Sequence, residues 1–107
     1  LILNSSVQNS FNQAVSADIP NELKDVLKGL STAVDEMIKN MQKEKADETV
    51  GDLENLVKEA TKSSPRKSHI KVTAEGLIKA AETVGKIGEP VIKLAGKVIA
   101  MFLASGI

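Results

Sequence analysis

Hydrophobic residues recur every three or four positions along most of the chain, and this spacing predicts α-helices. The clearest stretch follows Pro20, which suits a first helical turn because its missing N–H is not needed there, and extends to about Lys45. Charged residues, among them Asp35 and Glu36, are predicted to fill the opposite, solvent-facing side. The apolar side consists of Leu23, Val26, Leu27, Leu30, Ala33, Val34, Met37, Ile38 and Met41.

A second helix is predicted to begin at Asp47 and to end in residues 62–69, KSSPRKSH, where Pro65 interrupts the pattern. The charged residues of this helix are predicted to point outward, namely Asp52, Glu54, Lys58 and Glu59. Its apolar side consists of Val50, Leu53, Leu56, Val57 and Ala60.

Two more helices are predicted in the last third of the chain. Thr73 is expected to cap the third helix, and the sequence GKIGEP, residues 85–90, predicts a turn before the fourth. Because the links are short, consecutive helices are expected to run antiparallel. We therefore predict an all-α fold, a four-helix bundle made of two αα-hairpins.

The first eighteen residues, LILNSSVQNSFNQAVSAD, have a different composition, with one charge and many Asn, Ser and Gln residues. Because Asn and Ser are poor helix formers, an extended or strand-like segment is predicted, with Leu3, Val7, Phe11 and Val15 on one side. Such an uncharged segment either pairs with copies of itself or links the bundle to a preceding domain, and both interpretations stay open. The chain is accordingly divided into a lead, 1–18, and a helical bundle domain, 19–107.

The composition of the 107 residues fits one domain with an aliphatic core, because only Phe11 and Phe102 are aromatic. The absence of Cys removes disulfide and thiolate chemistry and is compatible with the cytosol. We expect a cytoplasmic protein, with membrane association as an alternative. The chain begins with Leu, and we interpret it as part of a longer protein.

Charge is divided unevenly although the formal net charge is zero. Residues 1–62 hold eleven acids and seven lysines, a net of −4, whereas residues 63–107 hold seven bases and three acids, a net of +4. We expect the halves to neutralise each other within one fold; the alternatives are pairing between copies and attraction of the basic half to an anionic surface.

No group of residues recommends a reaction. His69 is the only histidine, has no Cys to join it in a metal site, and is predicted to be a solvent-exposed loop residue. We therefore expect no enzyme, no cofactor, no metal and no small-molecule substrate. The basic residues Arg66, Lys67 and Lys71 lack interleaved aromatic residues, so a nucleic acid is not an expected partner either.

The last segment, VIKLAGKVIAMFLASGI, is apolar on nearly all sides. A narrow side carries its two charges and several small residues, namely Lys93, Gly96, Lys97, Ala100 and Ala104. The segment is shorter than the roughly 20 residues that span a bilayer. It is either a buried bundle helix or, with the preceding helix, a membrane-active hairpin whose lysines form the polar side.

The order of an Asn/Ser-rich lead (NSSVQNSFNQ), a charged helical pair (ELKDVLKGLSTAVDEMIKNM and DLENLVKEA) and a Gly/Ala-rich hairpin (AEGLIKAAETVGKIGEPVIKLAGKVIAMF) resembles C-terminal modules of bacterial multidomain signalling and defence proteins. This resemblance implies an accessory role in a larger bacterial protein. We predict a non-enzymatic protein-interaction or self-association module, whose partner is a second copy or an upstream domain. The alternative is a membrane-active effector domain. The candidate contact residues are Val7, Phe11, Val15, Lys93, Gly96, Lys97, Ala100 and Ala104.

Overall fold

The computed structural model describes residues 3–103, and within that range it contains helices and turns but no β-strand. The all-α prediction is confirmed for this part of the chain. The helices, in order, are α1 (Ser5–Ser16), α2 (Asn21–Ile38), α3 (Lys43–Ala60), α4 (Lys67–Glu82), the short 3₁₀ helix η1 (Gly85–Gly88) and α5 (Glu89–Leu103).

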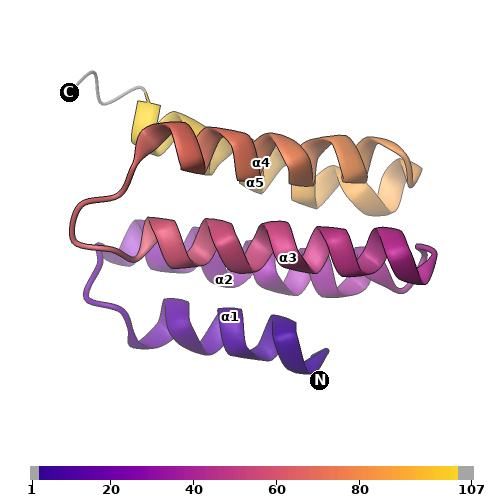
Figure 1. The fold of residues 1–107 in the computed structure, drawn as a ribbon, viewed down its shortest axis with the longest axis horizontal. Coiled ribbons are helices and arrows are strands. Elements are labelled where there is room, and N and C mark those ends of the chain that lie inside the picture. Colours follow the sequence, from indigo (N-terminus) through magenta and orange to yellow (C-terminus); the bar gives the residue numbers. More distant parts are fainter. Residues whose placement is uncertain (1–2, 104–107) are drawn as a thin grey trace.

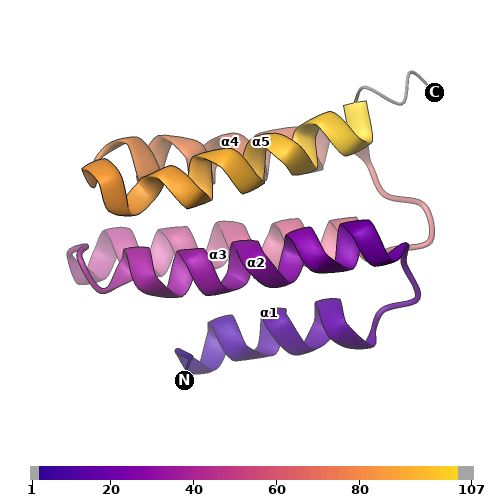
Figure 2. The same ribbon diagram turned by 180° about the vertical axis from the view of Figure 1, so that it is seen from behind.

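The helices form three tiers in a body of 37 × 24 × 19 Å (Figure 1). The first tier is α1 alone, the second contains α2 and α3, and the third contains α4 and α5, as the reverse view also shows (Figure 2). Contacts join α2 to α5 and α3 to α4 across the second and third tiers, while α1 packs on both α2 and α3. The third tier therefore covers one side of the α2–α3 pair, and α1 covers the other.

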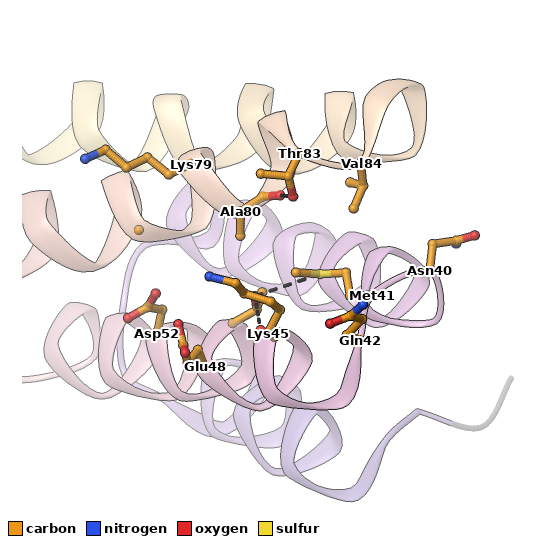
Figure 3. A pocket seen from close by; sticks show the side chains of 12 residues that line it. Asn40, Met41, Gln42, Lys45, Glu48, Asp52, Lys79, Ala80, Thr83 and Val84 are labelled. Carbon is orange, nitrogen blue, oxygen red and sulfur yellow. Dashed lines mark hydrogen bonds between the residues drawn. The ribbon is translucent and has the colours of Figure 1, made fainter.

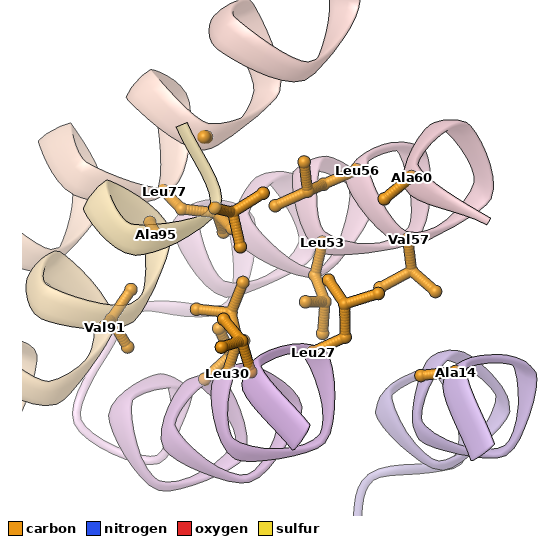
Figure 4. Packing of buried hydrophobic residues seen from close by; sticks show 14 of the residues in the cluster. Ala14, Leu27, Leu30, Leu53, Leu56, Val57, Ala60, Leu77, Val91 and Ala95 are labelled. Atoms are coloured by element: carbon orange, nitrogen blue, oxygen red, sulfur yellow. The ribbon is translucent and has the colours of Figure 1, made fainter. Parts of the chain in front are cut away.

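The core is aliphatic, as the composition predicted, and lies mainly between the second and third tiers. Leu27 and Leu30 of α2, Leu53 and Leu56 of α3, and Leu77 of α4 are completely buried. Figure 4 shows these side chains directed toward the same interior from different helices. Burying one such side chain stabilises the fold by about 1.5–3 kcal/mol before the entropic cost of ordering the chain is counted.

The lead is helical from Ser5 to Ser16, so the predicted extended or strand-like segment is wrong for these residues. Two interactions at the start of α1 compensate for its weak helix formers. The Asn4 side chain caps the helix by accepting from the backbone N–H groups of Ser6 and Val7. The buried carboxylate of Asp35, on α2, accepts the Asn4 N–H at 2.8 Å.

The side of α1 that packs on the body differs from the predicted side. Val7, Ser10 and Ala14 are buried, at spacings of three and four, whereas Phe11 is half-buried and Val15 is exposed. Residues four apart turn through 400° on a helix, so a run of such positions drifts around the surface. A small residue at position 14 and a hydroxyl at position 10 therefore complete the packed side.

Three predicted helix boundaries are also wrong. Helix α3 begins at Lys43 rather than at Asp47. The chain turns at residues 39–42 rather than after Lys45, and the half-buried Met41 still packs on the core from this turn. The spacing of apolar residues therefore continues past the end of α2, and the sequence pattern does not show where this helix ends. Helix α4 begins at Lys67, so Thr73 is not a cap; its hydroxyl lies inside the helix and donates to the His69 carbonyl at 2.8 Å.

The predicted turn at 85–90 is a 3₁₀ helix followed by the first turn of α5. Gly85 has a φ of +74°, a left-handed conformation that glycine adopts at little cost. Gly88 is buried against α4, where a Cβ would collide with the carbonyl oxygen of Ala81. Both glycines are therefore required by the backbone path that joins α4 to α5.

Candidate functional site

A groove of about 560 Å³ lies between α3 and α4, next to the turn that joins α2 to α3. Met41, Ala80 and Val84 contribute apolar surface to it, and the carboxylates of Glu48 and Asp52 lie one turn apart on α3 (Figure 3). Lys45 and Lys79 also line the groove, so its charged residues sum to zero. The volume lies within the range of small-molecule pockets.

Asp52 is the most perturbed group in this groove. Partial burial raises the pKa of Asp52, and the negative charge of Glu48 raises it further. The carboxylate is half-buried because it packs over Gly76 of α4, where a Cβ would lie only 2.5 Å from Asp52 Oδ2. The prediction that Asp52 simply points outward is therefore wrong.

The hydroxyl groups in this groove are engaged by their own helices. Thr49 Oγ1 donates to the Lys45 carbonyl at 2.8 Å, and Thr83 Oγ1 donates to the Ala80 carbonyl at 2.7 Å. No group of three His, Asp or Glu side chains in residues 3–103 could hold a metal ion.

A second groove, of about 410 Å³, lies farther along the same two helices at the corner where α3 leads into α4. The Glu59 side chain is 3% exposed and lies at the centre of an ion-pair cluster here. Glu59 Oε2 accepts the Arg66 backbone N–H at 2.8 Å, and Oε1 accepts from Lys62 Nζ at 3.1 Å and from Arg66 Nη2 at 3.4 Å. The prediction that Glu59 faces solvent is wrong.

These contacts lower the pKa of Glu59 to about 2. The backbone hydrogen bond from Arg66 is the main cause, and the hydrogen bonds from Lys62 and Arg66 and the charge of Lys62 outweigh the opposing effect of burial. Because Glu59 binds the N–H group that precedes α4, it also explains why this helix begins earlier than predicted.

His69 lies in the first turn of α4 rather than in a loop. Its side chain is 55% exposed, and Nδ1 lies 3.5 Å from Glu59 Oε1 and 3.4 Å from Arg66 Nη2. The predicted exposure of His69 is confirmed, whereas its place in a loop is wrong. The imidazole belongs to the Glu59 cluster.

The candidate contact residues of α1 have three different environments. Val7 is completely buried in the core, Phe11 is half-buried, and Val15 is 42% exposed. Val7 therefore holds α1 on the body and has no surface to offer a partner, while Val15 does.

Four candidate contact residues of α5 share its outward side. Lys93, Lys97 and Ala100 are exposed, and a Cβ at the half-buried Gly96 would meet nothing within 4 Å. Ala104 lies outside the described residues. Of the helices in residues 3–103, none combines the length and the apolar character needed to cross a bilayer.

The two oppositely charged halves of the chain pack against each other but form few ion pairs across their boundary. Among the described residues, Glu59 is the only acid of the first half that pairs with bases of the second half, Arg66 and His69. The remaining ion pairs, such as Lys39–Asp35 and Lys43–Asp47, lie within the first half. Most of the charge on each half is therefore not neutralised inside the fold.

Sequence reasoning missed Asp35 and Glu59, which both follow the pattern of outward charged residues. A usable signal existed only for Glu59, because it stands before a run of bases in which Lys62 and Arg66 lie three and seven residues away. No protein-family model matches the chain, and comparisons with curated proteins and with solved structures find no match either.

Proposed function

We propose that this chain is a non-enzymatic protein-interaction module that self-associates through the outward side of α5. The observation that carries this proposal is the incomplete burial of an apolar helix. Within α5 only Val91, Ala95 and Val98 are fully buried. Other large apolar side chains are half-buried, namely Ile92, Leu94, Ile99, Met101, Phe102 and Leu103. A second copy packed on α5 would remove more of this surface from water.

The small residues on this side favour close approach of another helix. The open space over Gly96 and the short side chain of Ala100 let a partner's backbone come near. The exposed Lys93 and Lys97 lie beside them and could pair with acids of the partner. The acidic first half of a second copy supplies such acids, because most of its charge is not neutralised within the fold.

The architecture that we propose for this module is a four-helix bundle, α2 to α5, made of two hairpins. In this view α1 is an added helix that the lead contributes, and the division between residues 1–18 and 19–107 stays a prediction. A second copy and an upstream domain of a longer bacterial protein are the proposed partners.

Light scattering over a wide concentration series tests self-association. Gly96→Glu places charge and bulk on the outward side of α5 and replaces a helix-interior glycine, so the fold is expected to tolerate it. Gly51→Glu is the matched control, because Gly51 is also half-buried within a helix, on α3, with nothing within 4 Å of a Cβ. We expect Gly96→Glu alone to shift the chain toward monomer, by tenfold or more in dissociation constant, which is about 1.4 kcal/mol.

Two results would contradict the proposal. One is a wild-type chain that stays monomeric at every concentration. The other is equal behaviour of the two glycine variants, since α5 would then have no special part in association.

Docking on an anionic membrane is the second candidate function. The observation that favours it is the position of the exposed Lys93 and Lys97 among half-buried aliphatic residues on one helix, a pattern typical of helices that lie in the membrane interface. Binding to anionic vesicles and dye release from them would test it, and Lys93→Glu should reduce both. Absence of binding at micromolar protein would rule out this function.

A further inference from the structure

We propose that the groove at the α3–α4 corner binds the phosphate group of a small organic phosphate. Lys58 of α3, Lys62 and Arg66 of the α3–α4 connection, and His69 in the first turn of α4 line this groove together. Three permanent cations, one on α3 and two on the α3–α4 connection, thus meet around a hollow of about 410 Å³. The connection is seen at the left of Figure 1. This site is separate from the α5 surface and does not depend on self-association.

The buried Glu59 holds the cations in place. It binds Lys62 Nζ and Arg66 Nη2 and also fixes the backbone at Arg66. Lys62 and Arg66 have three and five N–H donors, respectively, so each keeps donors that can reach a ligand. Cations held before the ligand arrives lose less conformational entropy on binding than free surface lysines do.

The charge of the groove remains positive after Glu59 is counted. Glu59 is the one acid among the residues that line it, and Lys58, Lys62 and Arg66 therefore leave a net charge of +2. Lys58 has no ion pair in the described part of the chain, so its ammonium group is available.

An apolar side chain at the groove indicates that the ligand has an organic part. Val72 lines the groove and is 67% exposed, more than Val15 or Ile87, the other exposed large hydrophobic residues among those described. A phosphate held by Lys58, Lys62 and Arg66 would leave the rest of the ligand next to this isopropyl group. Contact there would remove apolar area from both partners.

A small ligand fits this groove better than a nucleic acid or a membrane. No Phe, Tyr or Trp lines it, and the single imidazole of His69 gives successive bases little surface to stack on. Val72 is a single exposed aliphatic residue, which is too little for insertion into a lipid surface. The concave shape and the fixed cations instead match one multiply charged group.

Amide chemical-shift titrations with two probes test the proposal, at an ionic strength held constant with sodium chloride. The probes are inorganic phosphate and phenyl phosphate, whose ring supplies an apolar part. We expect saturable shifts confined to residues 58–73, with tighter binding of phenyl phosphate. Lys58→Gln should weaken both probes roughly three- to tenfold, whereas Val72→Ser should weaken phenyl phosphate alone.

Lys45→Gln is the matched control, because Lys45 is another exposed α3 lysine that lines the other groove. It should change neither titration, and Gly96→Glu should leave both unchanged even if it abolishes self-association. The proposal is overturned if shifts do not saturate, if residues of the other groove respond equally, or if Lys58→Gln and Lys45→Gln have the same effect. Tighter binding of anionic vesicles or single-stranded nucleic acid than of phenyl phosphate at this corner would also overturn it.

Discussion

The attachment of α1 can be tested by replacing Asp35 with Ala. Asp35 lies on α2 with 2% of its surface exposed, and its Oδ1 accepts the Asn4 N–H at 2.8 Å. The substitution removes this acceptor and leaves the backbone N–H of Asn4, the N-cap residue of α1, without its partner. It also removes a negative charge next to the N-terminal end of α1, where the helix dipole favours one.

The expected loss of stability is the favourable interaction of Asp35 with the start of α1 minus the cost of burying its carboxylate. A hydrogen bond to a charged group contributes about 1.5–3 kcal/mol, and the charge–dipole interaction adds about 0.3–1 kcal/mol. Against this, the buried Asp35 Oδ2 has no hydrogen-bond partner and lies 3.7 Å from Lys39 Nζ, so its removal relieves a desolvation cost. We expect a net loss of about 1–2 kcal/mol, with a decrease of roughly 4–8 °C in Tm for each kcal/mol.

Hydrogen exchange separates a local effect on α1 from a general loss of stability. Asp35→Ala should increase amide exchange most in residues 5–16, because the weak helix formers there depend on docking to stay helical. Glu36→Ala is the control, because Glu36 also pairs with Lys39 but is 51% exposed, and it should change stability by less than about 0.5 kcal/mol. Equal exchange in residues 5–16 of the two variants would refute the anchoring role of Asp35.

Three other predictions concern pH, glycine contacts and the core. The folded-state pKa of Glu59, about 2, lies below its ordinary value of 4.5, so its stabilising effect is present above pH 4.5 and is lost as the pH falls toward 2. Urea melts at neutral and acidic pH should therefore show a smaller acid-induced loss for Glu59→Gln than for the wild type. In Gly88→Ala the new methyl group meets the backbone of Ala81, and the unfolding free energy should fall by about 1–3 kcal/mol. In Gly76→Ala it meets only the movable Asp52 carboxylate, and the unfolding free energy should change by less than about 1 kcal/mol. Equal costs of the two substitutions would contradict this difference in their contacts. Leu30→Asp places a charge at a completely buried position and should cost about 4 kcal/mol or more, seen as loss of the helical circular dichroism signal.

The sequence predicted the helical nature of α2 to α5 better than their ends. Leu27, Leu53 and Leu56 were all predicted to face the interior, and each is completely buried. The predicted helix boundaries were wrong where contacts with residues distant in the sequence outweighed the local sequence signals. Met41 packs on the core from a turn, and the carboxylate of Glu59 holds the backbone that begins α4.

The lead illustrates a limit of helix propensity. Asn and Ser disfavour helices in isolation, and this preference alone predicted an extended segment. Packing of Val7 and Ala14 on α2 and α3 and the hydrogen bond to Asp35 reversed that preference. Both interactions depend on residues far away in the chain, and most helix stability in proteins comes from such packing.

The two grooves could not be predicted because they depend on how α3 and α4 lie against each other. Lys58 and Val72 are fourteen residues apart and become neighbours only when the helices pack. In the same way, Asp52 is half-buried only because Gly76 of the other helix leaves room for it. The sequence shows which side chains are charged and with which sign, but it does not show which of them form ion pairs.

By itself, the sequence determined that the chain after the lead is helical, that its core is aliphatic and that its two halves carry opposite charge. These properties follow from composition and from a period of three to four residues, which are local along the chain. Only the tertiary structure decided that the lead docks as a helix, that Asp35 and Glu59 are buried, and that α5 keeps apolar side chains half-buried. Each of these depends on contacts between residues that are distant in sequence or on different helices, and the free energy of such contacts outweighs local preference.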